Sequence, residues 1–372
     1  MADTTTERRR VAVIAAGGTG GHLFPAQALA EALISRGWKI VLATDERVGG
    51  LTQAFPAERV VELPAATARR GDPASAVNAA SVILRGVMEG RKALAEVDPS
   101  VVVGFGGYPS VPALIAAFSQ RRPTVIHEQN AVSGRANRLL APFATQIACA
   151  FPGLAKASRR TDARKVVVGN PVRPEIRGLA GKGYAPPTGE IRVLVTGGSQ
   201  GARLLSELIP AALAALPEPL RLRLRVEQQA RQESLEGARR AYADALIQAE
   251  VAPFFRDMAA RLERAHLVIG RAGASTVTEL MAAGRPAILV PLGIALDNDQ
   301  GRNAAILAQA GGAEVRLERD LDLESTTGLL SELLSDPARL ARMAAAAASL
   351  ARPDAAERLA DLVERTAGGA RA

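Results

Sequence analysis

The sequence predicts an α/β protein of two domains built on parallel sheets, and three observations support this prediction. Short apolar segments alternate with helical patterns along almost the whole chain, which is typical of parallel strands covered by helices on both faces. Two of these segments, residues 11–16 and 191–196, run into glycine-rich turns that precede helical patterns. The 372 residues suffice for two domains of ordinary size, and residues 177–189 between the halves are rich in Gly and Pro.

The first half of the chain carries a series of strand-like segments separated by helices. One helix is expected to begin at Phe24-Pro25, because proline suits a first helical turn. Further helices are predicted at residues 74–96 and 111–118. The predicted strands lie at residues 11–16, 38–44, 101–103, 123–127, 145–150 and 166–168. We therefore expect a first domain at residues 1–170.

The second half repeats this alternation after its own glycine-rich turn. Its predicted strands lie at residues 191–196, 222–226, 249–254, 266–269, 287–290 and 314–316. The last stretch, residues 336–365, is strongly helical in propensity, with a break at Pro353. We expect a second domain at residues 171–350, and within residues 351–372 a C-terminal helix that packs back on the first domain.

Composition and charge narrow the classes of partner. The formal net charge of +8 favours an anionic partner, such as nucleic acid, a membrane surface or a phosphorylated small molecule. Aromatic residues make up only 3% and do not alternate with basic clusters, so no nucleic-acid partner is expected. Cys149 is the only cysteine, which excludes a disulfide framework and a thiolate metal site and fits a reducing cytoplasm. Because no run of about 20 apolar residues occurs, any membrane contact is expected to be peripheral.

The first glycine-rich turn, residues 17–22, is the first candidate binding site. Backbone N–H groups in such a turn can approach a phosphate or diphosphate, and the following helix adds the positive end of its dipole. The dinucleotide fingerprint G-x-G-x-x-G fits poorly, because Leu23 stands where its third glycine or alanine belongs. A tight strand-to-helix turn without a ligand is the alternative. Asp45, at the end of the next strand, is either a ribose-binding residue of a dinucleotide enzyme or an ordinary turn residue.

Further motifs make a family resemblance specific. They occupy residues 17–22, 104–108, 127–130, 170–173, 197–201, 255–258, 270–280 and 297–303. In this order, from residue 11 to about residue 350, they resemble the MurG family of peptidoglycan synthesis. The resemblance implies a GT-B glycosyltransferase fold of two Rossmann-like domains whose parallel sheets face a cleft. It also implies a hexosyltransferase that moves N-acetylglucosamine from UDP-N-acetylglucosamine to undecaprenyl-diphospho-N-acetylmuramoyl-pentapeptide.

The resemblance implies that the second domain holds the UDP-sugar donor. In the family, the equivalent of Glu279 bonds the ribose hydroxyls, the equivalent of Gln300 reads the sugar, and Phe255 matches a position that meets uracil mainly through backbone groups. The residues expected to contact the donor are Thr19, Gly20, Gly21, Asn130, Arg173, Ser199, Phe255, Arg271, Ala274, Ser275, Thr276, Val277, Thr278, Glu279 and Gln300. Without the family, Thr276 and Glu279 form a capping-box pattern that merely begins a helix, and Arg173 is a solvated surface side chain.

The acceptor is expected to bind the first domain, where the family's glycine turns hold its diphosphate. The residues expected to contact that diphosphate are Gly17, Gly18, Gly104, Gly106, Gly107 and Tyr108. His22 is the candidate general base for the acceptor's C-4 hydroxyl, because an imidazole titrates near neutral pH. Glu128 is the rival base, and a structural or capping role is the alternative for His22. Direct displacement then converts an α-linked donor into a β-1,4 product without a covalent enzyme intermediate.

No metal or other cofactor is expected. Asp297 and Asp299 look like a D-x-D motif, which in the other glycosyltransferase fold would hold a divalent ion against the diphosphate. GT-B enzymes use helix dipoles and backbone amides for that purpose, so the resemblance implies no ion here. Metal ligation by these two carboxylates stays the alternative.

Because the family's acceptor is a membrane lipid, the first domain is expected to touch an anionic membrane surface. The apolar and basic candidates for this contact are Val82, Ile83, Leu84, Arg85, Val87, Arg91, Lys92, Phe118, Arg121 and Arg122. Part of this stripe must face the domain core, and Leu84 and Val87 are expected there. The resemblance implies a peripheral protein of the cytoplasmic face of the bacterial inner (plasma) membrane. It further implies a role in cell wall biogenesis, cell shape and cell division, with other cell-wall synthesis enzymes as candidate partners.

Three other functions stay open at the level of the sequence. A UDP-N-acetylglucosamine epimerase shares the same fold and would form UDP-N-acetylmannosamine without an acceptor. A nicotinamide oxidoreductase rests on Gly18, Gly20 and Asp45 and would bind NAD(P). A nonenzymatic scaffold at the membrane would need only the basic and apolar surface.

Overall fold

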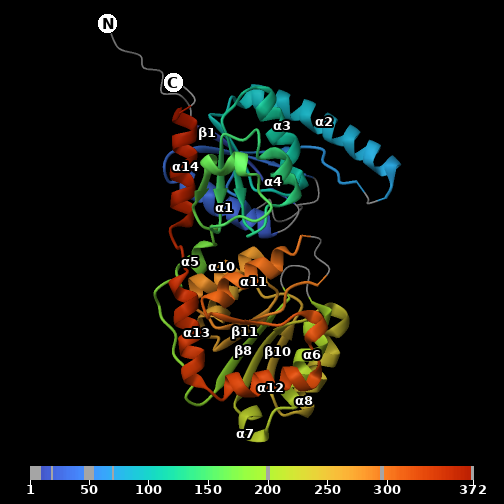
Figure 1. Cartoon of the computed structure of the whole chain (residues 1–372), viewed down its shortest axis with the longest axis vertical. Coiled ribbons are helices and arrows are strands. Elements are labelled where there is room, and N and C mark those ends of the chain that lie inside the picture. Colours follow the sequence, from blue (N-terminus) through green and yellow to red (C-terminus); the bar gives the residue numbers. More distant parts are fainter. Residues whose placement is uncertain are drawn as a thin grey trace. The chain divides into compact units, whose positions relative to one another are not determined.

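The structure is a computed structural model that describes residues 10–17, 20–45, 54–68, 71–197, 202–293 and 297–369. The chain forms two compact units, which Figure 1 shows in sequence colours. Unit 1 comprises Met1–Arg173 together with Asp354–Ala372, and unit 2 comprises Pro174–Pro353. Both divisions lie three residues beyond the positions expected from the sequence, so Arg173 is part of unit 1.

Unit 1 is built on a parallel sheet in the order β3-β2-β1-β4-β5-β6-β7. Its strands are β1 (Val11–Ala15), β2 (Lys39–Thr44), β3 (Arg59–Glu62), β4 (Val101–Gly104), β5 (Thr124–Glu128), β6 (Gln146–Cys149) and β7 (Lys165–Val167). The edge strand β3 is absent from the sequence prediction. It is only four residues long and none of its side chains is buried, so it carries neither the length nor the apolar pattern of a strand.

Helices cover both faces of this sheet. Successive β1 residues join different clusters: Ala12 and Ile14 pack on one face, and Val11 and Val13 on the other. Helices α1 (Gly20–Ile34) and α14 (Ala355–Gly369) lie on the first face, while α2 (Pro73–Val97), α3 (Val111–Ser119) and α4 (Arg135–Leu140) lie on the second (Figure 1). Both faces of the sheet are therefore covered by helices, and residues that bind a ligand are expected at the ends of the strands.

Helix α1 begins earlier than the sequence predicts. Its first residue is Gly20, so Pro25 lies inside the helix and His22 lies in the first turn. Glycine is a poor helix former, which is why Gly20 and Gly21 read as loop in the sequence. The glycine-rich turn is consequently shorter than expected, because its last residues, Gly20 and Gly21, belong to α1.

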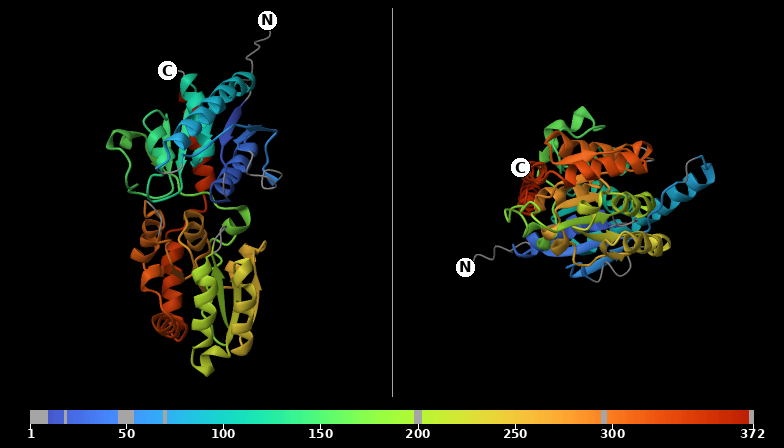
Figure 2. Two further views of the ribbon diagram at one scale, coloured as in Figure 1. Left: turned by 90° about the vertical axis from the view of Figure 1, so that its right-hand side faces the viewer. Right: turned by 90° about the horizontal axis from the view of Figure 1, so that it is seen from below.

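Helix α2 reaches beyond the other elements of unit 1, as the right-hand view of Figure 2 shows. Its buried residues are Ala79, Gly86, Gly90 and Leu94. Leu84 was expected in the core, but its side chain is 61% exposed, whereas Val87 packs against the core as expected. The reason is helical phase: Gly86 and Gly90 mark the buried face, and a Cβ on Gly86 would come within 2.1 Å of the Pro64 carbonyl oxygen. Within the described part of the chain, no helix combines the length and apolarity needed to cross a bilayer.

Unit 2 repeats the architecture with a six-stranded parallel sheet in the order β10-β9-β8-β11-β12-β13. Its strands are β8 (Ile191–Thr196), β9 (Leu224–Gln229), β10 (Gln248–Ala252), β11 (Leu267–Gly270), β12 (Ala287–Leu289) and β13 (Ala313–Val315). Its helices are α5 (Pro174–Arg177), α6 (Arg203–Ala214), α7 (Glu218–Arg221), α8 (Leu235–Asp244), α9 (Met258–Arg264), α10 (Ala274–Ala283), α11 (Asp299–Gln309), α12 (Leu323–Leu334) and α13 (Pro337–Ser349). The predicted break at Pro353 is confirmed, since α13 ends at Ser349 and α14 begins at Ala355.

Candidate active site

Four of the eight motifs follow the strands at which the order of each sheet reverses. In unit 1 these are β1 and β4, and in unit 2 they are β8 and β11. The carboxyl ends of such strand pairs form the crevice where parallel α/β sheets bind ligands. The glycine turns of unit 1 and the start of α10 in unit 2 thus lie at switch points, whereas Glu128, Asn130, Arg173, Phe255 and Gln300 lie at the ends of other strands or beyond them. Gly18, Thr19 and Ser199 lie outside the described residues.

The first glycine turn lies close against the end of β2. A Cβ on Gly17 would come within 2.9 Å of Thr44 Oγ1 and 3.0 Å of Asp45 Oδ1, so only glycine fits. Asp45 is buried, and its Oδ2 accepts a hydrogen bond of 2.9 Å from the Tyr108 hydroxyl. The carboxylate that a dinucleotide enzyme would offer to a ribose thus joins the two glycine turns of unit 1.

The second glycine turn requires glycine at two successive positions. Gly106 and Gly107 have φ angles of +79° and +69°, a backbone region that other residues adopt at a cost. A Cβ on Gly107 would also lie 3.4 Å from Nε2 of His22. Gly104 ends β4, and a Cβ there would lie 2.4 Å from Leu114, so glycine at this position also serves packing against α3.

His22 is held by a buried glutamine. Its Nδ1 lies 3.1 Å from Oε1 of Gln129, and Nε2 of Gln129 donates to the Phe105 carbonyl oxygen at 2.8 Å. Gln129 follows β5 directly and is 2% exposed, whereas His22 is half-buried. The imidazole is thereby fixed between α1, β5 and the second glycine turn.

Glu128 does not fit the role of a general base. Its carboxylate is 2% exposed, and both oxygens are occupied. Oε1 accepts from the backbone and side chain of Asn130 at 3.0 and 3.4 Å, and Oε2 accepts from the Gly134 N–H and from Asn137 Nδ2, each at 2.8 Å. A carboxylate has about four acceptor positions, so none is left for a substrate hydroxyl. Burial raises the pKa of Glu128 although these four donors oppose the shift, and its evident work is to hold the loop that carries Gln129 and Asn130.

Arg173 differs from the solvated side chain that the sequence alone suggests. It is half-buried, and its guanidinium carbon lies 4.7 Å from the centre of the Phe24 ring of α1. A guanidinium over an aromatic face is held by the ring's quadrupole. Arg173 is therefore placed against Phe24, close to the start of α1.

Helix α10 presents an uncapped N-terminus at the switch point of unit 2. Its N-cap is Gly273, which has no side chain to accept from the first turn. The capping-box interpretation of Thr276 and Glu279 is therefore wrong, because Thr276 stands three residues inside the cap. The first N–H groups of the helix are left for an anion, to which the positive end of the dipole adds about 0.3 to 2 kcal/mol.

The residues of α10 that are predicted to contact the sugar donor differ in burial. Ala274, Val277 and Thr278 are buried, and the Thr278 hydroxyl donates to the carbonyl oxygen of Ala274 at 2.9 Å. Ser275, Thr276 and Glu279 are half-buried. The first group can meet a ligand only through backbone atoms, and the second group also offers side chains.

Arg271 is tied into the structure of unit 2 rather than offered as a free cation. Its Nη1 donates to the Val290 carbonyl oxygen at 3.1 Å, and its Nη2 forms an ion pair with Glu318. Glu318 Oε2 in turn accepts from the Gly293 N–H at 3.0 Å. Burial works to raise the pKa of Glu318, but the bonds from Arg271 and Gly293 outweigh it and lower that pKa.

Gln300 lies on the same loop system. Its Oε1 accepts from the Leu292 N–H at 3.0 Å, one residue before the Gly293 contact of Glu318. Its amide nitrogen makes no hydrogen bond to the described residues. The side chain expected to read a sugar therefore has its donor end available.

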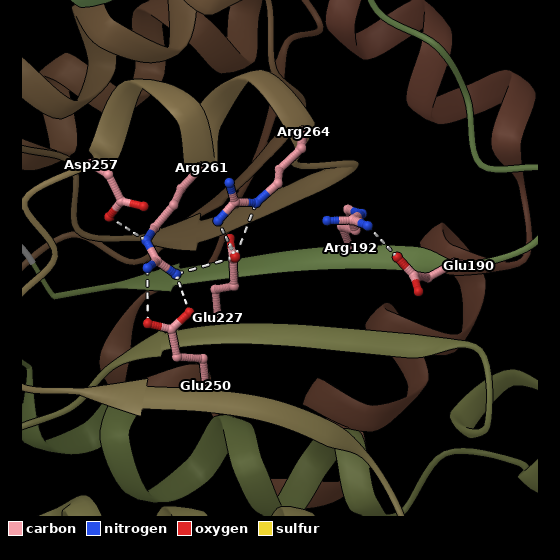
Figure 3. A network of polar contacts seen from close by, with 7 residues as sticks. All are labelled: Glu190, Arg192, Glu227, Glu250, Asp257, Arg261 and Arg264. Carbon is pink, nitrogen blue, oxygen red and sulfur yellow. Dashed lines mark hydrogen bonds and ion pairs between the residues drawn. The ribbon is translucent and has the colours of Figure 1, made fainter.

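Phe255 is buried beneath Arg261, whose guanidinium carbon lies 3.7 Å from the ring centre. Figure 3 shows that guanidinium among three carboxylates: Glu250 accepts two bonds of 2.8 and 2.9 Å, Asp257 accepts one of 2.8 Å, and Glu227 lies 3.2 Å away. Arg264 pairs with Glu227 as well. The Phe255 side chain is thus buried, so Phe255 itself can contact a ligand only through its backbone.

The D-x-D motif marks the start of a helix. Asp299 is the first residue of α11, and Asn298 takes a left-handed conformation as its N-cap. Among the described residues, no group of three or more His, Cys, Asp or Glu side chains is arranged to hold a metal ion. Asp297 and Asp299 therefore find no third protein ligand there.

Sequence reasoning missed three residues that shape these two sites: Gln129, Arg261 and Glu318. Gln129 was part of a motif, but nothing in the neighbouring sequence indicated that this polar side chain would be fully buried. Arg261 and Glu318 are charged residues in helical surroundings, and such residues normally face solvent. Only the spacing of Asp257 and Arg261, four apart at a helix start, gave a local signal.

Two family models match the chain. The Glycosyltransferase family 28 N-terminal domain matches residues 12–149, and the Glycosyltransferase family 28 C-terminal domain matches residues 192–359. Together they span more than half of the chain and fall on the two sheets described above.

Curated relatives match over nearly their whole length. The UDP-N-acetylglucosamine–N-acetylmuramyl-(pentapeptide) pyrophosphoryl-undecaprenol N-acetylglucosamine transferase of Phenylobacterium zucineum (strain HLK1) is 65% identical over 363 residues, which are 97% of this chain and 100% of the relative. The transferase of the same name from Caulobacter vibrioides (strain NA1000 / CB15N) is 60% identical over 96% of this chain and 99% of its own.

Solved structures give the same picture at greater distance. The crystal structure of Acinetobacter baumannii MurG superimposes with a TM-score of 0.78 at 31% identity and covers 96% of this chain and 99% of its own. A putative UDP-N-acetylglucosamine 2-epimerase from Listeria monocytogenes reaches a TM-score of 0.67 at 15% identity, with 96% of each chain covered. The second likeness shows a shared fold alone.

Proposed function

The chain belongs to the MurG family of glycosyltransferases, within glycosyltransferase family 28, and from this membership we propose that it makes the family's lipid-linked disaccharide. It is a GT-B enzyme that transfers N-acetylglucosamine from UDP-N-acetylglucosamine to undecaprenyl-diphospho-N-acetylmuramoyl-pentapeptide. The observation that carries this proposal is the 65% identity to a transferase of that name over its entire length. Peptidoglycan synthesis is the corresponding process.

The proposed chemistry is a single in-line displacement. The C-4 hydroxyl oxygen of the acceptor sugar forms a bond to the anomeric carbon of the donor sugar, and the bond from that carbon to the UDP oxygen breaks. The hydroxyl proton goes to Nε2 of His22. Attack opposite the departing UDP inverts an α-linked donor to a β-1,4 product.

The two switch points support a division of labour. In unit 2, the uncapped start of α10 receives the diphosphate that becomes the leaving group, while Glu279 and Gln300 contact the ribose and the sugar. In unit 1, Gly17, Gly106 and Gly107 leave room for the acceptor's diphosphate beside His22. This fits positioning and electrostatic stabilisation as the main sources of catalysis.

A direct assay tests the proposed function. Purified chain is incubated with radiolabelled UDP-N-acetylglucosamine and the lipid-linked acceptor, with and without EDTA. We expect labelled lipid product at equal rates in both samples and no UDP-N-acetylmannosamine when acceptor is left out. Absence of labelled lipid would reject the transferase, epimer formation would favour the epimerase, and loss of activity with EDTA would restore the metal alternative.

Two substitutions test the assigned roles. His22→Ala should lower kcat by roughly 100-fold or more, the usual contribution of general base catalysis, with the donor KM unchanged.

Glu279→Ala should raise the donor KM at little cost to kcat, since removing one hydrogen-bonding group to a ligand costs about 1 to 3 kcal/mol. Glu236→Ala is a matched control in unit 2, because this glutamate of α8 lies at the surface in a pair with Arg239 and should leave the donor KM unchanged.

Peripheral attachment to the cytoplasmic face of the inner membrane is part of the proposal. Helix α2 carries Val77, Leu84 and Met88, which are 72%, 61% and 64% exposed and, by helical spacing, lie on one side of the helix. Arg85 and Lys92 are exposed beside them. Three such apolar side chains reaching the acyl boundary, together with basic residues worth about 1 kcal/mol each near anionic lipid, suffice for reversible binding.

Vesicle flotation measures this attachment. The double variant Leu84→Gln/Met88→Gln should bind vesicles of anionic phospholipid at least about tenfold more weakly than the parent chain, because both lost side chains are apolar anchors. Leu222→Gln, at a 51% exposed leucine of unit 2, is the control and should bind as the parent does. Equal flotation of the double variant would exclude α2 as the contact.

A further inference from the structure

The hydrogen bonds around His22 determine which ring nitrogen carries the proton. Gln129 is enclosed, and its amide reaches two groups: the Phe105 carbonyl oxygen at 2.8 Å and His22 Nδ1 at 3.1 Å. A carbonyl can only accept, so the NH2 end of the amide must face Phe105. The opposite orientation would bring two oxygens to 2.8 Å without a hydrogen between them.

With the amide so oriented, its oxygen faces the imidazole. An oxygen acceptor requires a proton on Nδ1 of His22, and a neutral imidazole with a proton on Nδ1 has a lone pair on Nε2. That Nε2 lies toward Gly107, where even a Cβ would come within 3.4 Å. The unprotonated nitrogen therefore faces the glycine turn expected to hold the acceptor.

We infer that Gln129 is a positioning residue that holds His22 in the Nδ1–H tautomer, so that Nε2 is ready to accept a proton. The inference rests on the proposed function for the identity of that proton. Gln129 does this through a chain of three groups: the Phe105 carbonyl orients the amide, the amide orients the ring, and the ring presents Nε2 to the second glycine turn. A neutral amide fixes the tautomer without adding a negative charge beside it.

The other two histidines of the chain supply internal controls. His127 Nε2 lies 3.0 Å from the Gly169 carbonyl oxygen, which requires a proton on Nε2. His266 Nδ1 accepts from the Arg192 N–H at 2.9 Å, which again leaves the proton on Nε2. The structure therefore assigns one Nδ1–H histidine and two Nε2–H histidines.

Nitrogen NMR of the full chain with ¹⁵N-labelled histidine tests the assignment directly. Spectra are recorded at about pH 8, where neutral imidazole dominates, and His127→Gln and His266→Gln identify the signals by their loss. We expect a pyridine-type signal at Nε2 for His22 and at Nδ1 for the other two. An Nε2–H tautomer for His22 in the parent chain overturns the inference, whatever the transferase assay gives.

Two substitutions of similar size distinguish the loss of the hydrogen-bond acceptor at residue 129 from a change in packing. Gln129→Met and Gln129→Glu both lose the donor to Phe105, but only Glu keeps an oxygen for Nδ1–H. Met should shift His22 toward the Nε2–H tautomer and lower kcat roughly tenfold at unchanged donor KM, since one ordinary hydrogen bond separates the tautomers. Glu should keep the Nδ1–H tautomer. The tautomer alone is its readout, because the carboxylate adds a negative charge beside the ring and an oxygen facing Phe105, and both change kcat for other reasons.

The outcomes remain distinct from those of the proposed function. A Met variant that keeps the Nδ1–H signal, or a Glu variant that loses it, overturns the positioning role. A parent chain with the expected tautomer but no transfer of N-acetylglucosamine rejects the proposed function and leaves the tautomer assignment intact.

Discussion

The three histidines of the chain differ in burial and in their hydrogen bonds, and these differences give each side chain different acid–base properties. His22 is half-buried at a helix start, His266 is part-buried in unit 2, and His127 is fully buried in β5. Nδ1 of His127 has no hydrogen-bond partner among the residues that the structure describes, so a second proton on this ring would be left without an acceptor there. Burial lowers the pKa of His127 to about 4, although its bond to Gly169 opposes the shift.

His127 should make unit 1 sensitive to acid. Below its ordinary pKa of 6.5 the unfolded chain takes up a proton that the folded chain refuses down to about 4, so the free energy of unfolding falls as pH falls through this window. The loss amounts to about 2 kcal/mol by pH 5. His127→Gln keeps a donor for Gly169 but cannot titrate, and it should remove this part of the pH dependence.

Urea unfolding followed by tryptophan fluorescence measures the effect. Trp38 is the only tryptophan and packs in the core of unit 1, so its signal reports this unit. His266→Gln in unit 2 is the control and should keep the acid sensitivity of the Trp38 transition. The same loss between pH 7.5 and 5 in His127→Gln as in the parent would contradict the assignment.

At the scale of residues, the sequence predicted which side chains gather but not how each is used. Gly17, Gly106, Gly107 and His22 were found because turns and their chemistry are local. The exclusion of Glu128 as a base depends on donors six and nine residues away at Gly134 and Asn137, and local pattern carries no record of such contacts. Gln129 is similar, since its partners lie 24 and 107 residues away.

Helix α9 and the strands beside it form the element that shapes the Phe255 segment. Arg261 is 6% exposed, and its bonds to Glu250 and Asp257 join β10, the segment after it and the helix start. These carboxylates raise the pKa of Arg261, against the effect of burial, so it stays a cation. The position of the backbone expected to meet uracil therefore depends on one guanidinium.

Arg261→Lys should loosen this segment without removing the charge. An ammonium cannot bind Glu250 with two parallel bonds or stack flat on Phe255, so the donor KM should rise roughly threefold to tenfold while kcat changes little. Arg342→Lys is the control, since Arg342 of α13 lies at the surface in a pair with Asp336 and should leave KM unchanged. An unaltered KM in Arg261→Lys would show that the segment holds its shape by other contacts.

At the scale of elements, strong apolar patterns predicted most strands of both sheets, whereas the predictions failed where the local signals are weak. Strand β3 was missed because pairing with β2, not burial, defines it. Helix α1 was begun too late because its first turn consists of poor helix formers. The capping box was wrong because Gly273, which has no side chain, caps α10 three residues earlier. Each error lies where tertiary contacts override local propensity.

At the scale of the whole chain, unit 1 is completed only by its last helix. The chain leaves unit 1 after Arg173 and returns at Asp354, so α14 packs on α1 and β4 from the far end of the sequence. Leu359, Leu362 and Val363 enter the same core as Trp38, and the Trp38 indole N–H donates to Glu364 at 2.9 Å. The helical propensity of its residues predicts this helix, but no local pattern identifies the distant elements on which it packs.

Leu359→Ala should therefore destabilise unit 1 although it lies beyond unit 2 in the sequence. Leu359 is fully buried, and truncating such a side chain costs about 2 to 5 kcal/mol, depending on how far the cavity collapses. The urea midpoint of the Trp38 transition should fall accordingly, while calorimetric binding of UDP, assigned to unit 2, should keep its affinity. Arg358→Ala, on the same helix but paired only with Asp354 at the surface, should leave both unchanged. If Leu359→Ala instead weakened UDP binding while the Trp38 transition stayed in place, α14 would have to act on the donor site and not on the core of unit 1.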